Sequence, residues 1–159
     1  MSFLDSLVGS HFRFPDHYVV GREKIREYAA AVKNNDPAFF EEADAAGLGH
    51  EALLAPLTFI SVFGYQAQTA MFAAADVTLT DKKIVQVDQV LKFLKPVKAG
   101  DTLYCDVWID SIRKAHGTDV IVTKNIISNE SGDVVQETYT TLAGRSEEDG
   151  ESGFSNGTA

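Results

Sequence analysis

The stretch VKNNDPAFFEE, residues 32 to 42, holds the side chains whose types and spacing come nearest to an acid–base site. Asp36 could act as a general base, because a carboxylate placed beside a substrate can accept a proton. It also stands directly before Pro37, at the end of a predicted helix, and a turn position explains an aspartate there without any chemistry. We therefore expect Asp36 to be a turn residue.

Metal and nucleophile chemistry are not indicated by the histidines or the single cysteine. His11, His17, His50 and His116 are scattered, and none stands at metal-ligand spacing from another or from Cys105. Cys105 falls on the apolar side of an alternating segment, where packing explains it better than nucleophilic attack. We expect no metal site and no cofactor.

Two glutamines lie in IVQVDQVLKF, residues 84 to 93. A period of two places Gln89 on the apolar face, between Val87 and Leu91, where a buried amide needs hydrogen-bond partners. That amide could face a reaction site, or it could make only a structural hydrogen bond to the loops of a central helix. The same count places Gln86 on the opposite face, as an interface or solvent residue.

The part of the chain before residue 84 shows helical periodicity. Apolar residues from Ile25 to Val32 recur at helical spacing and predict a helix that starts near Gly21 and ends before Pro37. Glycines end a further short helix expected at 41 to 46. The next segment, 52 to 75, carries no charged side chain, and we expect a long buried helix from about residue 56 to 73. Its polar residues argue against a membrane span.

From residue 84 onward the period changes to two. Short turns, KPVKAGD, RKAHG and NESGD, separate segments that alternate between apolar and polar side chains: IVQVDQVLKF, TLYCDVWIDSI, TDVIVTKNIIS and VVQETYTTLAG. Four successive strands with short connections predict an antiparallel meander, each strand beside the one before it, that follows one long helix. The fold class is therefore α+β, in a single domain.

Composition narrows the setting. A chain of 159 residues is long enough for one domain with a hydrophobic core, and its net charge of -9 argues against nucleic acid or an anionic membrane as the main partner. One cysteine excludes an internal disulfide and favours a reducing, cytoplasmic location. No basic region precedes the first apolar residues, so we expect no signal peptide. Acidic and turn residues from 146 to 159 predict a disordered acidic tail.

Longer segments resemble the MaoC-like hydratases. FLKPVKAGDTLYCDV is similar to their strand-turn-strand, and GLGHEALLAPLTF to the entry into their central helix. GREKIREYA, IVQVDQVLKF and HGTDVIVTKN most specifically resemble the HadA-type subunits of mycobacterial (3R)-hydroxyacyl-ACP dehydratases. The resemblance covers nearly the whole chain to about residue 145, and it implies one hot-dog domain over 1–145, with a long central helix wrapped by an antiparallel sheet.

The catalytic positions of that family are changed here. Active members carry a Gly-Asp-x-Asn-Pro-(Leu/Ile)-His loop, whose Asp and His move the protons of a reversible dehydration. Aligning Pro37 with the motif proline places Asn34 at the acid position and Phe39 at the histidine position, and neither can serve. Pro56 stands where the family usually offers a helix N–H to the thioester oxygen, and proline has none. The resemblance therefore implies no catalytic residue in this chain.

A subunit without the dyad implies a partner that has it. We expect a HadB-like MaoC-like hot-dog subunit to supply the Asp and His, in fatty-acid elongation toward mycolic acids. An acyl carrier protein would present the 3-hydroxyacyl or 2-enoyl thioester, and this chain would accommodate the acyl tail. The substrate-binding residues expected on this basis are Phe39, Leu54, Pro56, Phe59, Ser61, Phe63, Gln86 and Gln89.

Two other functions stay open. A non-enzymatic lipid-binding homodimer would also need an apolar tunnel and no dyad. An independent thioesterase would need a carboxylate on or facing the central helix, and the absence of acidic residues from 52 to 75 counts against it.

Overall fold

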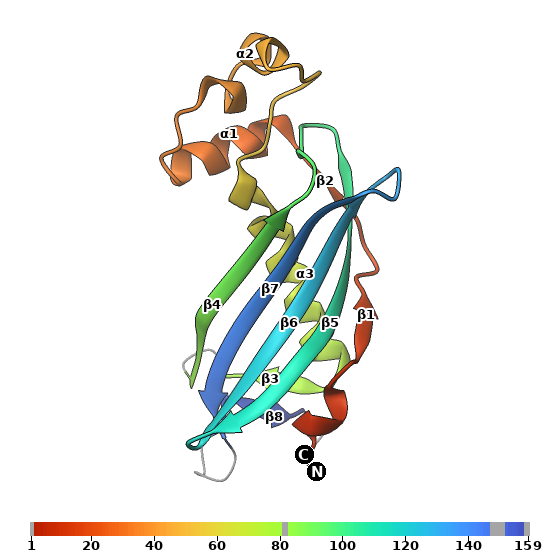
Figure 1. Cartoon of the computed structure of the whole chain (residues 1–159), viewed down its shortest axis with the longest axis vertical. Helices are drawn as coiled ribbons and strands as arrows, with labels where there is room; N and C mark the ends of the chain where they lie inside the picture. Colours follow the sequence, from red (N-terminus) through yellow and green to blue (C-terminus); the bar gives the residue numbers. More distant parts are fainter. Residues whose placement is uncertain (1, 81–82, 147–151, 158–159) are drawn as a thin grey trace.

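One antiparallel sheet backed by one long helix forms most of the computed structural model, which describes residues 2–80, 83–146 and 152–157 (Figure 1). The strand order in the sheet is β1-β5-β6-β7-β4, and β2 also pairs with β5. The strands are β1 (His11–Arg13), β2 (Tyr18–Val19), β4 (Ile84–Phe93), β5 (Thr102–Ala115), β6 (Thr118–Asn129) and β7 (Val134–Arg145).

The uncharged segment forms the central helix, as predicted. It opens with a 3₁₀ turn, η3 (Leu57–Ile60), and continues as α3 (Ser61–Ala74), which packs mainly against β5 and β6 (Figure 1). Phe72 and Ala67 of α3 are fully buried, as are alternate residues of β5, because every second side chain of a strand points to the same face. The α+β class and the hot-dog arrangement expected from the sequence are confirmed.

The prediction of four strands in succession was wrong in one connection. Strands β5, β6 and β7 form a meander, but β4 pairs with β7 at the far edge, so residues 94–101 cross the end of the sheet. That crossover is held by the chain before the central helix: Ala55 N–H donates to the Val97 carbonyl at 2.8 Å, and Ala99 N–H to the Leu53 carbonyl at 2.9 Å. The KPVKAGD segment does turn the chain, but a turn sequence does not reveal which strands become neighbours in the sheet.

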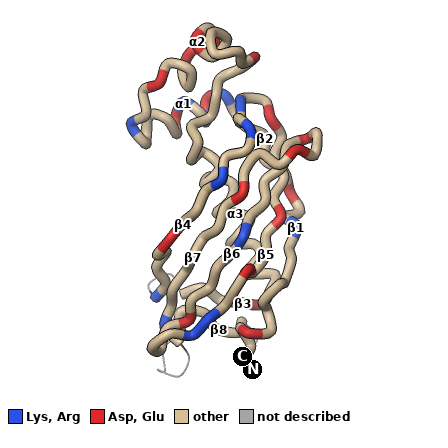
Figure 2. Tube along the Cα trace, in the orientation of Figure 1, with Lys and Arg blue, Asp and Glu red and all other residues tan. Residues whose placement is uncertain are grey.

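Short helices gather at one end of the sheet and form what we call the overhang, residues 22–51 (Figure 1). They are α1 (Arg22–Ala31), the 3₁₀ turn η2 (Pro37–Phe39) and α2 (Glu42–Gly47). Residues of both signs lie along α1, whereas the charged residues of α2 are all acidic (Figure 2). A separate 3₁₀ turn, η1 (Leu4–Leu7), precedes β1.

The expected disordered tail is partly an ordered strand. Residues 154–156 form β8 (Phe154–Asn156), which pairs antiparallel with β3 (Val77–Leu79) at the end of the molecule opposite the overhang (Figure 1). Phe154 is fully buried, which a composition argument from acidic and turn residues could not foresee. Residues 147–151, 158 and 159 of that prediction lie outside the described part of the chain.

No helix among the described residues is long and apolar enough to cross a membrane. The sheet covers one side of the central helix, where Phe63, Ala67 and Phe72 are buried. Ser61, Tyr65 and Thr69 on its other side are exposed, so the prediction of a buried helix was correct for one side only.

Candidate functional site

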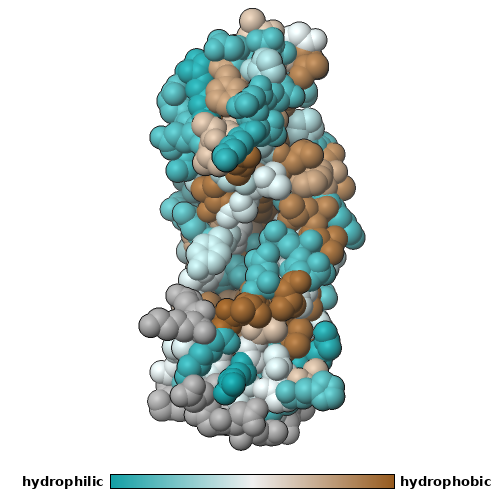
Figure 3. Space-filling model, turned by 90° about the vertical axis from the view of Figure 1, so that its left-hand side faces the viewer, coloured by the Kyte–Doolittle hydropathy of each residue, from teal (hydrophilic) through white to brown (hydrophobic). Residues whose placement is uncertain are grey.

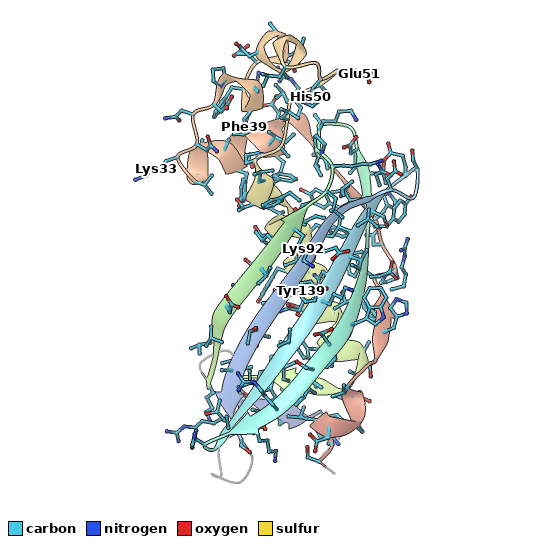
Figure 4. The ribbon with its side chains drawn as sticks, in the orientation of Figure 1. Lys33, Phe39, His50, Glu51, Lys92 and Tyr139 are labelled. Atoms are coloured by element: carbon cyan, nitrogen blue, oxygen red, sulfur yellow. The ribbon has the colours of Figure 1, made fainter. Side chains whose placement is uncertain are left out.

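An outer cavity of about 400 Å³ lies where the overhang meets the crossover and the end of β4. Most of its lining is apolar. Its apolar members include Phe39, Leu54, Pro56, Leu57, Phe93 and Leu94, and its ionisable members are Asp36, His50 and Lys95. Figure 4 shows Phe39 and His50 near each other within the overhang.

Local hydrogen bonds place Phe39 at this cavity. Asp36 caps the 3₁₀ turn η2, because its Oδ1 accepts the Ala38 N–H at 3.0 Å. The Leu54 N–H in turn donates to the Ala38 carbonyl at 3.1 Å, which ties the turn to the chain leading into the central helix. Asp36 therefore has the structural role predicted for it.

Ion pairs tie the helices of the overhang together. Arg22 on α1 pairs with Glu42 on α2, and the side chain of Arg26 donates from Nε to the Phe40 carbonyl at 2.9 Å. The hydrogen bond from Arg22 lowers the pKa of Glu42 to about 2. Because both side chains are exposed, this pair contributes little to stability and mainly sets how α1 and α2 lie.

Phe39 and Asn34, which the alignment on Pro37 places at the family's histidine and acid positions, lie in different surroundings. Phe39 lines the outer cavity, while Asn34 is exposed, lines neither cavity, and its Oδ1 accepts the Asp36 N–H at 3.4 Å. Among the described residues that line either cavity, Asp36 carries the one carboxylate and His50 the one imidazole.

A second, inner cavity of about 490 Å³ lies between α3 and strands β4, β6 and β7. Ile60 and Gln136 line both cavities, so the two adjoin. Hydrogen-bonding side chains dominate its lining: Tyr28, Thr58, Ser61, Tyr65, Gln68, Gln86, Gln89, Asn125, Gln136, Thr138 and Thr140.

Many of these polar groups pair with one another. Thr123 Oγ1 donates to Gln68 Oε1 at 2.8 Å, and Asn125 Nδ2 donates to the Gly64 carbonyl at 3.1 Å. Gln136 Nε2 donates to Thr138 Oγ1 at 3.2 Å. Since these bonds use polar atoms, the methyl and methylene carbons of the same side chains remain as contact surface.

Two polar features of the inner cavity have specific consequences. The Tyr28 hydroxyl donates to Thr58 Oγ1 at 2.8 Å, and Ser61 Oγ donates to the Thr58 carbonyl at 2.8 Å, so both hydroxyls fix the start of the central helix. Asn125 Oδ1 is buried without a hydrogen-bond partner among the described residues. That oxygen is available to a ligand or to water in the cavity.

The sequence count was wrong for Gln86. The pairing of β4 with β7 shifts between Gln86 and Asp88, so a bulge inserts one residue there. Beyond a bulge the alternation changes phase, and Gln86 therefore lines the same inner cavity as Gln89 instead of the opposite face. Gln89 lines this cavity too, and its Nε2 donates to Thr140 Oγ1 on β7 at 3.4 Å instead of to the loops of the central helix, so the structural bond expected for it has a different partner.

The remaining predicted residues fall into three groups. Leu54 and Pro56 line the outer cavity together with Phe39, and Ser61 lines the inner one. Phe59 and Phe63 line neither cavity. Their rings are fully buried against Tyr18 on the β2 side of the helix, with centroids 6.2 and 5.5 Å from it. Helical spacing predicted that these phenylalanines are buried but could not tell which side of the helix faces a cavity.

Sequence reasoning missed the polar row on β6 and β7. Thr123 and Asn125 alternate with buried Ile121 and Ile127 on the inward face of β6, and both are buried. Polar residues at inward positions of a strand were visible in the sequence, and that alternation could have revealed them.

Cys105 is buried in the sheet, and burial raises the pKa of its thiol to about 12. A thiol that keeps its proton is a poor nucleophile, which agrees with a packing role. The described residues hold no group of three or more histidine, cysteine, aspartate or glutamate side chains able to bind a metal ion.

Known proteins similar to this chain include dehydratases. The family model described as "FAS1-like, dehydratase domain region" matches residues 6–138. A UPF0336 protein of Mycobacterium leprae (strain TN) is 64% identical over 159 residues, covering 100% of both chains.

Solved structures show the same arrangement. A chain in the crystal structure of the C-terminal-truncated HadBC (3R-hydroxyacyl-ACP dehydratase) complex from Mycobacterium tuberculosis is 46% identical, with a TM-score of 0.79 over 87% of this chain and 97% of that one. A MaoC-like dehydratase is 34% identical, with a TM-score of 0.82 over 92% of this chain and 44% of that longer chain.

Proposed function

Because this chain belongs to the FAS1-like, MaoC-like hot-dog dehydratases, we propose that it is the accessory, acyl-chain-binding subunit of a heteromeric (3R)-hydroxyacyl-ACP dehydratase. The reaction removes water from a 3-hydroxyacyl thioester to give a trans-2-enoyl thioester. The observation that carries the proposal is the pair of adjoining cavities, with Phe39 lining the outer one at the position aligned with the family's histidine.

Dehydration needs a group that takes the α-proton and a group that protonates the leaving β-hydroxyl. Phe39 stands at the cavity in the place of the family's histidine, and Asn34 lines no cavity. Asp36 is engaged as a cap of the turn before Phe39. The chemistry therefore belongs to a partner subunit that carries the Asp and His.

The edge strand β4 supports a partner of the same fold. Its ten residues pair on one side with β7, and among the described residues no strand pairs with its other side. Apolar side chains exposed on and beside it are Val85, Val87, Val90, Phe93, Leu94, Leu57 and Tyr65. Figure 3, seen from the β4 side, shows hydrophobic surface gathered there. A long, apolar, unpaired edge invites another strand, and a second hot-dog sheet would extend this one.

An acyl tail would enter this chain across that edge. The inner cavity opens beside β4 and is contacted by Gln86, Gln89 and Leu91 of that strand. Its amides and hydroxyls bond largely to one another, so the surface that they leave for an alkyl chain is mostly carbon. Each methylene buried there contributes about 0.8 kcal/mol.

Docking of an acyl carrier protein is assigned to the partner. Carrier proteins are acidic, and this chain has a net charge of -9. The lysines near the crossover are already paired: Lys92 with Glu137 at 3.9 Å, Lys95 with Asp133 at 2.8 Å, and Lys98 with Asp101 at 3.2 Å. Paired lysines leave little free positive charge for a carrier. We further propose that the reaction belongs to fatty-acid elongation toward mycolic acids, which the similarity to mycobacterial proteins supports.

Hydration of trans-2-enoyl thioesters, followed as loss of enoyl absorbance, tests the proposal. We expect no activity from the purified chain alone and activity from its mixture with a dyad-bearing hot-dog partner, rising with acyl length. A chain that hydrates alone would overturn the accessory role. A stable homodimer that copurifies with lipid and never activates a partner would favour the lipid-binding function instead.

A further inference from the structure

The C-terminal strand β8 is docked into the end of the fold opposite the overhang. Phe154 is fully buried, and its ring centroid lies 6.2 Å from that of Phe72 on α3. Backbone bonds fix the strand on both sides: the Gly153 N–H donates to the Arg145 carbonyl at 2.9 Å, and the Thr80 N–H donates to the Gly153 carbonyl at 3.0 Å. The segment is therefore part of the core.

Two glycines form the seat of the Phe154 ring. A Cβ at Gly144, on β7, would stand 2.7 Å from Cε2 and 3.0 Å from Cδ2 of Phe154. A Cβ at Gly153 would stand 2.9 Å from the Cα of Gly144 and 3.0 Å from the Lys83 carbonyl oxygen. Any larger residue at either position would collide, so the sequence at β7 and at the C-terminus fits one specific ring position.

This ring lies one layer beyond the lining of the inner cavity. Gln68 lines the cavity, and Phe72 follows one helical turn later on the same face, fully buried. On the sheet, Gln86 lines the cavity and pairs across the strands with Leu142, which is buried. Beyond the amides comes an apolar layer, with Phe154 packed against Phe72.

We propose that Phe154 determines how long an acyl chain the subunit accepts, by backing Phe72 in the apolar layer just beyond the inner cavity. The inference rests on the proposed function, because it takes the inner cavity as the site of the acyl tail. Phe154 fills the space beside Phe72, with the two ring centroids 6.2 Å apart. A smaller side chain at 154 extends the cavity by the volume of the missing ring atoms.

The test compares Phe154→Leu and Phe154→Ala with the unchanged chain, each in complex with the dyad-bearing partner, over a series of trans-2-enoyl thioesters of increasing length. A matched control is Phe63→Leu, since Phe63 is fully buried, as Phe154 is, but packs against Tyr18 on the β2 side of the central helix and not in the layer beyond the inner cavity. Each extra methylene that finds room is worth about fourfold in affinity, so we expect kcat/KM for a chain two methylenes past the wild-type optimum to rise about fifteenfold relative to the optimum.

Activity on the shortest thioesters should stay within about twofold of wild type, because those chains end before the apolar layer. An active complex whose length preference is the same in Phe154→Leu as in Phe63→Leu and wild type overturns the inference and leaves the proposed function intact.

If the wild-type mixture hydrates no thioester, the proposed function fails, and the inference is then decided without activity. Saturated fatty acids of increasing length would compete with a fluorescent fatty acid for the isolated chain. Longer competitors should gain affinity in Phe154→Leu alone. Equal profiles in Phe154→Leu and Phe63→Leu, or no binding at all, overturn it. Should Phe154→Ala fail to fold, the milder Phe154→Leu carries the comparison.

Discussion

Replacing Gly144 by alanine should displace the C-terminal strand β8, although it substitutes no residue of that strand. The new Cβ would stand 2.7 Å from Phe154 Cε2 and 3.3 Å from the Gly153 Cα. The ring edge could shift, but the backbone of Gly153 lies beside it and is held by its bond to the Arg145 carbonyl. The added methyl therefore strains the seat of Phe154 from inside the sheet.

The loss of unfolding free energy caused by Gly144→Ala has a lower and an upper bound. Overpacking a core typically costs about 1–3 kcal/mol, against which a compatible Gly-to-Ala change returns about 0.4–1 kcal/mol. If the ring is expelled instead, the loss approaches the about 3–5 kcal/mol typical of removing a buried phenylalanine. We expect a net loss of about 2 kcal/mol, which in a chain of this size lowers Tm by about 4–8 °C.

Thermal and denaturant unfolding of the isolated chain measure this loss, with Gly47→Ala as the matched control. Gly47 is the last residue of α2, and a Cβ there meets nothing within 4 Å, so its change should be neutral or slightly stabilising. The double variant Gly144→Ala, Phe154→Leu should lose less unfolding free energy than the sum of the two single losses, because the leucine leaves room for the methyl. Full additivity, or a neutral Gly144→Ala, would refute the close fit between Gly144 and the ring.

Three further predictions concern the cap, the buried thiol and the edge strand. Asp36→Ala should cost about 0.5–2 kcal/mol in unfolding free energy by removing the cap on the Ala38 N–H, whereas Asp36→Asn keeps a capping oxygen and should be near neutral. Because burial raises the pKa of Cys105 from 9.0 to about 12, its native thiol should react with a thiol reagent at pH 8 on the order of a thousandfold more slowly than in denaturant. The unfolded thiol ionises above about pH 9 and the native one only near 12, so this group should lower the unfolding free energy as pH rises between those values; a pH-independent contribution, obtained by comparison with Cys105→Ala, would contradict this. Val90→Lys should leave the stability of the isolated chain within about 0.5 kcal/mol but weaken partner binding in a titration, while Val8→Lys, at a similar exposure away from β4, should do neither.

Much of the fold could be predicted because it depends on local periodicity. The alternation from residue 84 to 93 coincides with β4, and the uncharged segment with the central helix. The crossover after β4 could not be predicted, since a turn sequence such as KPVKAGD specifies a change of direction and not the strand reached next. Phe154 was also missed, because its burial depends on Gly144 and Phe72, both distant in sequence.

The candidate site was predicted unevenly for a similar reason. The loss of acid–base groups at Asn34 and Phe39 could be predicted, because it depends on residue type at a fixed spacing from Pro37, and it stays a prediction. Which residues line the cavities depends on the phase of the alternation along a strand and on the rotation of the helix about its axis. A single bulge moved Gln86 to the inner face, and the rotation of the central helix turned Phe59 and Phe63 away from both cavities. Neither effect changes the local pattern from which the sequence was interpreted.

The central claim is that this chain accommodates the acyl tail and a partner does the chemistry. Asp36 and His50 are the carboxylate and the imidazole among the described residues lining the two cavities, and they offer the direct test. The measurement is kcat for enoyl-thioester hydration by the complex that carries Asp36→Asn together with His50→Gln. We predict a rate within about threefold of the unchanged complex, and loss of activity when the partner's dyad histidine is replaced. A fall of about a hundredfold or more from the double substitution in this chain would contradict the account, because that is the size expected when a general acid or base is removed.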